Sequence, residues 1–74
     1  MEKFWALDYV NDETNECELV YGDQLYATEA DAQLARLRAD CTNQLEVNWY
    51  TILDLEDDVF DCPFTIDDHL HIIY

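Results

Sequence analysis

The sequence predicts an α+β fold, an antiparallel four- or five-stranded sheet with one helix packed on a face, in the order ββαββ. Two observations carry this prediction. Segments of alternating apolar and polar residues, typical of half-buried strands, lie on both sides of a segment with helical spacing. Turn-forming residues separate these segments, and no repeat or linker divides the 74 residues. We therefore expect a single acidic domain over residues 1–74.

The first half of the chain predicts a β-hairpin. Residues 3–10 carry aromatic side chains on both faces, so this strand should be central in the sheet. The polar run 11–15 predicts a turn, because its residues tolerate unusual backbone angles or bond their own main chain. Residues 16–21 predict a second strand, on which Glu16 and Glu18 share one face.

The helix is predicted over residues 29–41. Thr28 is a favourable N-cap, and Asp31 stands where the acid of a capping box stands. Arg36 and Asp40 have a spacing that allows contact. Apolar residues at helical spacing predict one narrow stripe that packs on the sheet: Ala30, Leu34, Leu37 and Cys41.

The last third of the chain predicts two further strands and an irregular piece. Residues 45–55 alternate throughout and would span about 35 Å as one long strand. Pro63 predicts an edge strand or an irregular loop over residues 59–66, and residues 69–74 predict a final strand. One helix is too short to cover the sheet, so we expect an uncovered sheet face that serves as a binding or self-association surface.

The strongest compositional signal is acidic. Eighteen acidic residues against three basic ones give a formal charge of −15, whereas a magnitude of about 2–8 is enough for solubility in a small domain. Seven of these acids lie in residues 54–68, a stretch without a basic residue that also contains aromatic and β-branched side chains. We therefore expect the charge on folded protein and not on a disordered tail. The excess excludes direct binding to nucleic acid or to an anionic membrane, and it favours basic proteins or divalent metals as partners.

Acids two residues apart on extended strands would form regular rows of carboxylates. Neighbouring carboxylates of Glu16 and Glu18, and of Asp54, Glu56 and Asp58, would lie about 6.6 Å apart. Duplex DNA places one phosphate per about 3.4 Å of axis on each strand, so such a row can stand in for phosphates. The predicted partner-binding residues are these and other nearby acids with two aromatic anchors: Asp54, Glu56, Asp57, Asp58, Asp61, Asp67, Asp68, Glu16, Glu18, Tyr50 and Phe60. Trp49 is expected in the core.

Catalysis and cofactor binding have little support. No glycine loop for phosphates and no nucleophile–base signature occurs, so we expect no enzyme activity and no cofactor. His69 and His71, with Asp67 and Asp68 nearby, are residue types that can ligate zinc. Such a histidine pair more often lies on a solvent-exposed strand face, so we predict no metal site. Residues 54–61 match a calcium loop only in charge.

The cysteines and the apolar runs predict a cytoplasmic location. Cys17, Cys41 and Cys62 are odd in number and show no CxxC spacing, so we expect reduced, mostly buried thiols. No apolar run approaches the roughly 18 residues of a membrane span, and the first ten residues lack the pattern of a signal peptide. The expected compartment is the cytoplasm of a host cell.

In size, charge and α+β layout, the whole chain resembles the small acidic proteins that phages and mobile elements encode as DNA mimics. These include anti-CRISPR proteins, anti-restriction proteins and uracil-DNA glycosylase inhibitors. The resemblance contains no shared motif, so no family residue is carried over to this chain. It implies an inhibitor, in our interpretation an anti-CRISPR protein, that evades antiviral defence by occupying the nucleic-acid site of a Cas effector or another nuclease complex. The alternative is a small structural or regulatory interaction protein, such as a homodimer, whose charge only keeps it soluble.

Overall fold

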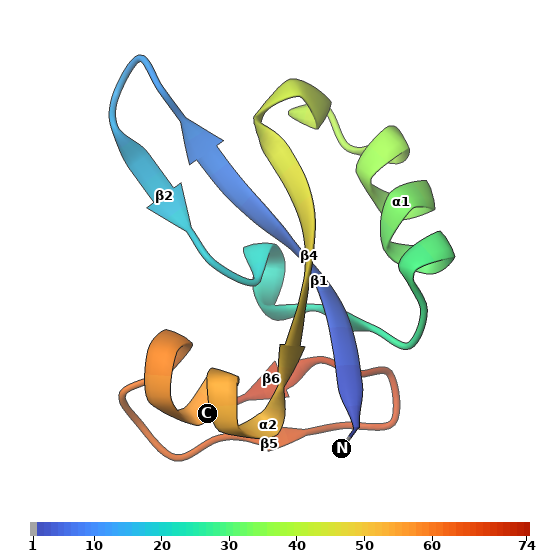
Figure 1. Cartoon of the computed structure of the whole chain (residues 1–74), viewed down its shortest axis with the longest axis vertical. Helices are drawn as coiled ribbons and strands as arrows, with labels where there is room; N and C mark the ends of the chain where they lie inside the picture. The colour runs from blue at the N-terminus through green and yellow to red at the C-terminus, as the bar shows by residue number, and fades with distance from the viewer. Residues whose placement is uncertain (1) are drawn as a thin grey trace.

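The chain folds into an antiparallel sheet, a helix on one face of that sheet and a C-terminal segment on the other (Figure 1). A computed structural model describes residues 2–74. The elements are β1 (Lys3–Asn11), β2 (Glu16–Glu18), η1 (Tyr21–Asp23), β3 (Leu25–Tyr26), α1 (Glu29–Arg38), η2 (Thr42–Gln44), β4 (Leu45–Thr51), α2 (Ile52–Asp54), η3 (Leu55–Val59), β5 (Thr65–Ile66) and β6 (Ile72–Ile73). The predicted α+β class is confirmed, with four strands in the main sheet. β5 and β6 do not extend that sheet but pair with each other in a separate ribbon.

β1 is the central strand, as its two-sided aromatic pattern predicts. β4 pairs antiparallel along one edge of β1, with the partners running from Lys3 opposite Thr51 to Tyr9 opposite Leu45. β3 and β2 share the other edge, β3 near the start of β1 and β2 near its end. The second strand is shorter than the predicted 16–21, because Val20 has a left-handed backbone (φ 53°) that ends the extended conformation.

α1 begins where the sequence predicts and packs with a different face. The Thr28 hydroxyl accepts the Asp31 N–H at 3.1 Å, which confirms the N-cap. The predicted apolar stripe is wrong, since Leu34 and Leu37 are 47% and 68% exposed. Small residues face the sheet instead: Ala32, Ala35 and Ala39 pack with the aromatic side chains of the strands. Short side chains let a helix lie close to a sheet face that already carries bulky aromatic groups.

The C-terminal end of α1 comes earlier than the predicted residue 41. The Thr42 hydroxyl donates to the carbonyls of Arg36 (2.8 Å) and Ala39 (2.7 Å), and these bonds satisfy carbonyl groups at the end of the helix. The Arg36 Nε donates to the Leu45 carbonyl at 2.7 Å and so ties the helix to β4. Arg36 forms no ion pair with Asp40, the contact that their spacing allows.

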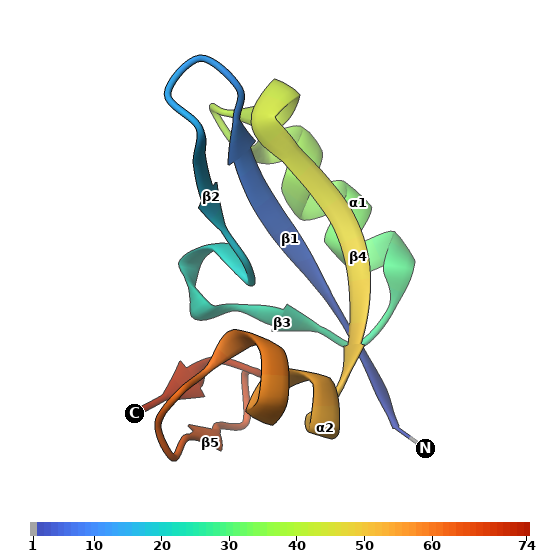
Figure 2. The ribbon, with the colours of Figure 1, turned by 60° about the vertical axis from the view of Figure 1, so that its left-hand side comes forward.

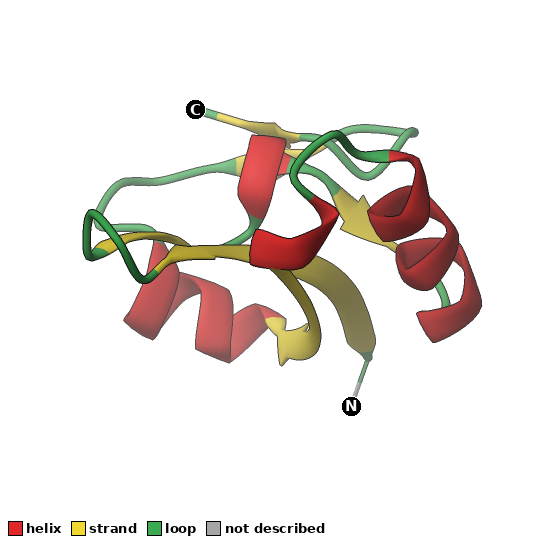
Figure 3. Ribbon diagram, turned by 90° about the horizontal axis from the view of Figure 1, so that it is seen from above, coloured by secondary structure: helices red, strands yellow, loops and turns green. Residues whose placement is uncertain are grey.

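The second face of the sheet is covered at one end, contrary to the prediction of an uncovered face. The C-terminal segment crosses it on the side away from α1, and helical segments lie on both sides of the strands (Figures 2 and 3). A core cluster joins the segment to the sheet: Phe4, Ala6, Val20, Leu25, Leu55, Phe60 and Ile72. The residues between β4 and β5 reach this face because they are helical, which turns the chain back over the sheet. Within residues 2–74, no helix has the length and apolar character needed to cross a membrane.

Candidate functional site: the acidic side of the molecule

The acidic stretch 54–68 starts as a helix and not as a strand. The Thr51 hydroxyl accepts the Asp54 N–H at 3.2 Å, and the Asp54 carboxylate accepts the Thr51 N–H at 3.0 Å. This reciprocal capping box ends β4 and begins α2. The predicted strand over residues 45–55 is therefore wrong beyond Thr51.

A π-helical turn, η3, decides which of these acids face solvent. Leu55 is fully buried, and its carbonyl accepts the Phe60 N–H at 2.9 Å, so both ends of the turn are fixed. The acids on and after the turn are exposed: Glu56, Asp57, Asp58 and Asp61. Because the backbone is helical, the predicted row of Asp54, Glu56 and Asp58 with a spacing of about 6.6 Å does not form. Single π-helical turns are rare and occur frequently at functional sites.

Of the two predicted aromatic anchors, Phe60 is buried and Tyr50 is half-buried. Phe60 is 8% exposed and packs in the core, with its ring centroid 4.9 Å from that of Phe64. Tyr50 stands opposite Phe4 on the face that the C-terminal segment covers, and its hydroxyl donates to the Asp8 carboxylate at 2.6 Å. Trp49, which we expected in the core, is instead 48% exposed. Neither predicted anchor projects from the surface as a free side chain.

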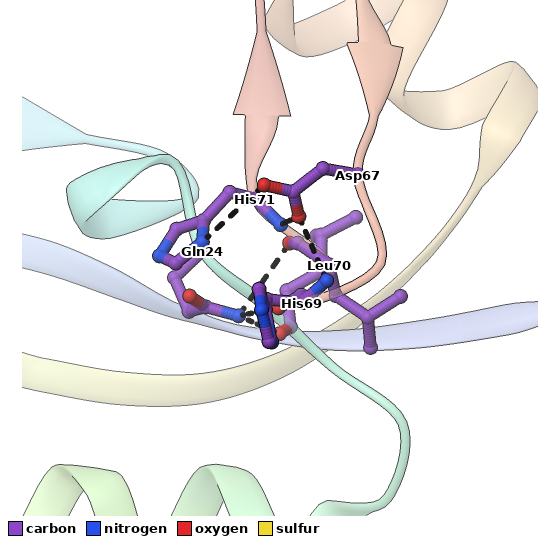
Figure 4. A network of polar contacts seen from close by, with 6 residues as sticks. Gln24, Asp67, His69, Leu70 and His71 are labelled. Atoms are coloured by element: carbon purple, nitrogen blue, oxygen red, sulfur yellow. Dashed lines mark hydrogen bonds and ion pairs between the residues drawn. The ribbon is translucent and has the colours of Figure 1, made fainter.

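Asp67 holds a turn of the C-terminal segment together (Figure 4). Its carboxylate oxygen Oδ1 accepts the N–H groups of His69 and His71, each at 2.9 Å, and Oδ2 lies 3.8 Å from the His71 Nδ1. The hydrogen bond from His71 is the main cause that lowers the pKa of Asp67. Gln24 fixes this turn to the sheet by donating to the His69 carbonyl at 2.8 Å. Asp67 is therefore a structural acid, while its neighbour Asp68 is exposed.

Asp8 is a buried acid that the sequence did not single out. It is 5% exposed and accepts three hydrogen bonds, from the Tyr50 hydroxyl, the Asn48 side-chain amide (2.7 Å) and the Val20 N–H (3.1 Å). None of these donors is a cation. Burial and the bond to Asp8 raise the pKa of Tyr50. The only signal in the sequence is an acid among apolar residues in a central strand.

Further acids lie on the β1–β2 hairpin and the turn after it. Glu16 and Glu18 are exposed on β2, as predicted for a solvent-facing pair. Asp23 accepts the Tyr74 hydroxyl at 2.8 Å, which connects this turn to the end of the C-terminal segment. Partial desolvation, together with that bond, raises the pKa of Tyr74 to about 12.

The charge is distributed unevenly over the molecule. Residues 12–23 and 52–68 contain twelve of the eighteen acids and no basic residue; we call these two segments the acidic side. Residues 29–41, by contrast, combine three acids with two arginines. In Figure 1 the hairpin and the helical turns of α2 and η3 lie in the left half, and α1 lies on the right. These two acid-rich parts of the chain, the hairpin and the helical turns, therefore lie in the same half of the molecule, and the row predicted for Asp54, Glu56 and Asp58 is absent.

The basic residues do not neutralise the acidic side. Lys3 places its ammonium group 4.5 Å from the centroid of the Trp49 ring, and Arg36 bonds a backbone carbonyl. The one ion pair within residues 2–74 is that of His71 and Asp67. The exposed carboxylates of the acidic side therefore keep their charge available for external cations.

Two hollows lie on either side of the Pro63–Phe64 dipeptide. The acidic hollow, of about 300 Å³, is lined by Glu56, Phe60, Asp61, Cys62, Pro63 and Phe64. The apolar hollow, also of about 300 Å³, is lined by Pro63, Phe64, Thr65, Ile73 and Tyr74. Each has a size at the lower end of the range for small-molecule sites.

The histidines and cysteines form no metal site in the part of the chain that the structure describes. No group of three or more His, Cys, Asp or Glu side chains in residues 2–74 is arranged to hold an ion. The three cysteines are free thiols. Cys17 and Cys62 are exposed and Cys41 is half-buried, so the expectation of mostly buried cysteines is wrong. Cys17 lies on β2 at the sheet edge, where its side chain has no covering element.

No protein-family model matches the chain, and neither the curated proteins nor the solved structures contain a significant match to it.

Proposed function

We propose that this protein is a stoichiometric inhibitor of a nucleic-acid-binding enzyme complex, and that it acts as an anti-CRISPR-like DNA mimic in the cytoplasm of a host cell. The observation that supports this proposal is the acidic side: twelve acids on two segments without a basic residue, whose exposed carboxylates have no ion pair within residues 2–74. Unpaired charge of one sign lowers the stability of a compact protein, so a partner that uses the charge gives a reason for it.

The proposed mechanism is occupation of a basic groove. Carboxylates of Glu56, Asp57, Asp58 and Asp61 pair with target arginines and lysines that otherwise hold phosphates or read a base edge. Charges at the rim of such an interface accelerate association, and salt weakens them. The inhibitor itself performs no chemistry, and it needs no cofactor.

Capture from a bacterial lysate, followed by a mobility-shift assay, tests the proposal. The protein is immobilised, retained proteins are eluted with rising salt, and a captured nucleic-acid-binding protein is assayed with its DNA or RNA. We expect the added protein to release the nucleic acid at a stoichiometry near one to one. Unchanged nucleic-acid affinity of the captured protein, or no complex on a sizing column, would contradict the proposal.

Two charge-reversal variants make this test specific. The triple change Asp57→Lys, Asp58→Lys and Asp61→Lys alters the acidic side at exposed positions. The control, Glu29→Lys, Asp31→Lys and Asp40→Lys, makes the same change in net charge on and after α1, also at exposed positions. We expect the first variant to lose inhibition and the control to keep most of it. Equal losses would mean that net charge alone is responsible.

A second candidate function is a small acidic structural or regulatory interaction protein that forms a homodimer. The exposed leucines of α1, Leu34 and Leu37, favour it, because two large apolar side chains one helical turn apart face solvent there. This candidate predicts a dimer mass in sedimentation equilibrium, and Leu34→Gln with Leu37→Gln should reduce it to a monomer mass. The same pair of changes leaves the proposed DNA mimic active.

A further inference from the structure

The acidic hollow combines carboxylates with aromatic rings. Two exposed carboxylates, Glu56 and Asp61, line it, and two aromatic rings, Phe60 and Phe64, form part of its wall. The two rings pack against each other, with centroids 4.9 Å apart and planes tilted by 48°, and both contribute to the lining of the hollow. The π-helical turn brings this about, because it places Glu56 and the residues after Val59 around the same opening.

These features match one side-chain chemistry better than others. A guanidinium group is planar, stacks on aromatic faces and can donate hydrogen bonds to two carboxylates from its fixed fork of N–H groups. A lysine ammonium group lacks the plane and the fork, and a metal ion needs a set of ligands that residues 2–74 do not supply. Neither Glu56 nor Asp61 has an ion pair with any residue in 2–74, so both are free to meet an external cation.

We propose that the acidic hollow binds an arginine side chain of a basic partner protein, and that the apolar hollow takes an apolar side chain of the same partner segment. The shared wall of Pro63 and Phe64 makes the two hollows neighbours, which allows one short segment to fill both. This inference rests on the proposed function and adds to it the anchor of the interface. Buried arginine and aromatic anchors carry most of the binding energy of many protein interfaces, while the surrounding charges mainly steer association.

A peptide titration of the full chain labelled with ¹⁵N tests the arginine pocket. The probe is acetyl-Gly-Arg-Leu-Gly-amide, compared with a peptide in which neutral citrulline replaces arginine and one in which glycine replaces leucine. We expect saturable NMR shifts at the backbone amides of residues 60–62, 64 and 65, and a dissociation constant at least about tenfold larger for the citrulline peptide. Equal binding of the citrulline peptide, or shifts spread evenly over the acidic side, would overturn the inference.

Two double variants separate the pocket from general charge attraction. Glu56→Gln with Asp61→Asn removes both carboxylates of the acidic hollow, and Asp57→Asn with Asp58→Asn removes two exposed carboxylates that do not line it. All four positions are exposed, so both proteins should fold. We expect the first variant to weaken binding of the arginine peptide about tenfold and the second to change it less than about twofold. Equal weakening of peptide binding by the two double variants would overturn the proposal of an arginine pocket.

The outcomes also distinguish this inference from the proposed function. Suppose that a nucleic-acid-binding protein is captured and inhibited, but the Glu56→Gln/Asp61→Asn variant inhibits it equally well. The proposed arginine pocket is then wrong, while the proposed DNA mimicry is supported. If the arginine peptide binds the acidic hollow but no captured protein loses its nucleic acid, the proposed DNA mimicry is wrong and the arginine pocket is supported.

Discussion

Two regions of the molecule place carboxylates in opposite environments. Asp8 is buried in the sheet, whereas the acids of residues 56–61 face solvent. Asp8 is 5% exposed and accepts three hydrogen bonds. The acids of the turn are exposed, and those that line the acidic hollow have no ion pair in the described residues. Neither region has a cation partner within the fold, since the donors around Asp8 are a backbone N–H, an amide and a hydroxyl.

This comparison shows how the fold tolerates its charge. The acids that hold parts of the fold together accept hydrogen bonds mainly from neutral donors. Asp54 accepts the Thr51 N–H, Asp23 accepts the Tyr74 hydroxyl, and Asp67 accepts backbone N–H groups. Neutral donors satisfy the lone pairs of a carboxylate without cancelling its charge. The chain therefore gains the structural benefit of these acids and still presents a negative surface to a partner.

Removing Asp8 should have the largest effect on stability. Asp8→Ala leaves the Val20 N–H and the Tyr50 hydroxyl without acceptors in the interior, so we expect the free energy of unfolding to fall by about 4 kcal/mol. For a domain of this size, that loss corresponds to a drop in melting temperature of roughly 15–30 °C. Calorimetry measures it, with Asp12→Ala on the exposed hairpin turn as the control. A loss as small as that of the control would mean that Asp8 is dispensable.

Removing Asp54 should have an intermediate effect. Asp54→Ala breaks the capping box with Thr51 and should lower the free energy of unfolding by about 1 kcal/mol. Asp57→Ala, three residues further along and exposed, is the matched control. Urea unfolding of both variants gives the comparison. If Asp57→Ala lowers the free energy of unfolding by as much as Asp54→Ala, the distinction between acids that stabilise the fold and acids that only face solvent is wrong.

The sequence predicts the elements that local chemistry decides. Alternation with aromatic side chains on both faces predicted the central strand β1, and Thr28 predicted the start of α1. The end of β4 was missed although its signal is present: Thr51 and Asp54 have the spacing of a capping box. Unbroken apolar–polar alternation through residues 45–55 obscured it.

Other features depend on tertiary packing and have no local signal. The leucines of α1 are the larger apolar side chains, yet Ala32 faces the sheet because the aromatic side chains there leave little space. Likewise, nothing local tells Trp49 from Tyr50 as the exposed aromatic residue of β4. That choice depends on the C-terminal segment, which covers the face of Tyr50. The acidic character of the site was predictable from composition, whereas its helical geometry and its hollows were not.

Neutralising two acids of the turn should have a small effect of the opposite sign. Asp57→Asn with Asp58→Asn removes like charges that repel their neighbours, so we expect the melting temperature to rise by no more than about 2–4 °C at low salt. The gain should shrink at 1 M salt, where screening acts within about 3 Å. Melting curves at both salt concentrations check this. A lower melting temperature would show that these acids make stabilising contacts after all.

Acidification of the medium should reveal the contribution of Asp67, the smallest of these effects. Hydrogen bonds from His71 and then His69 lower the pKa of Asp67 below its usual 3.8, so the folded state favours the ionised form. The resulting stabilisation is fully present above pH 3.8, the pKa of Asp67 in the unfolded chain. It is lost as the pH falls through the lower pKa that Asp67 has in the folded protein. The measurement compares unfolding of the protein and of Asp67→Asn from pH 6 to pH 2.5. The gap between their midpoints should narrow below about pH 4, and Asp68→Asn, at an exposed neighbouring position, is the control. A gap that stays constant with pH would mean that the turn 67–71 does not depend on an ionised carboxylate.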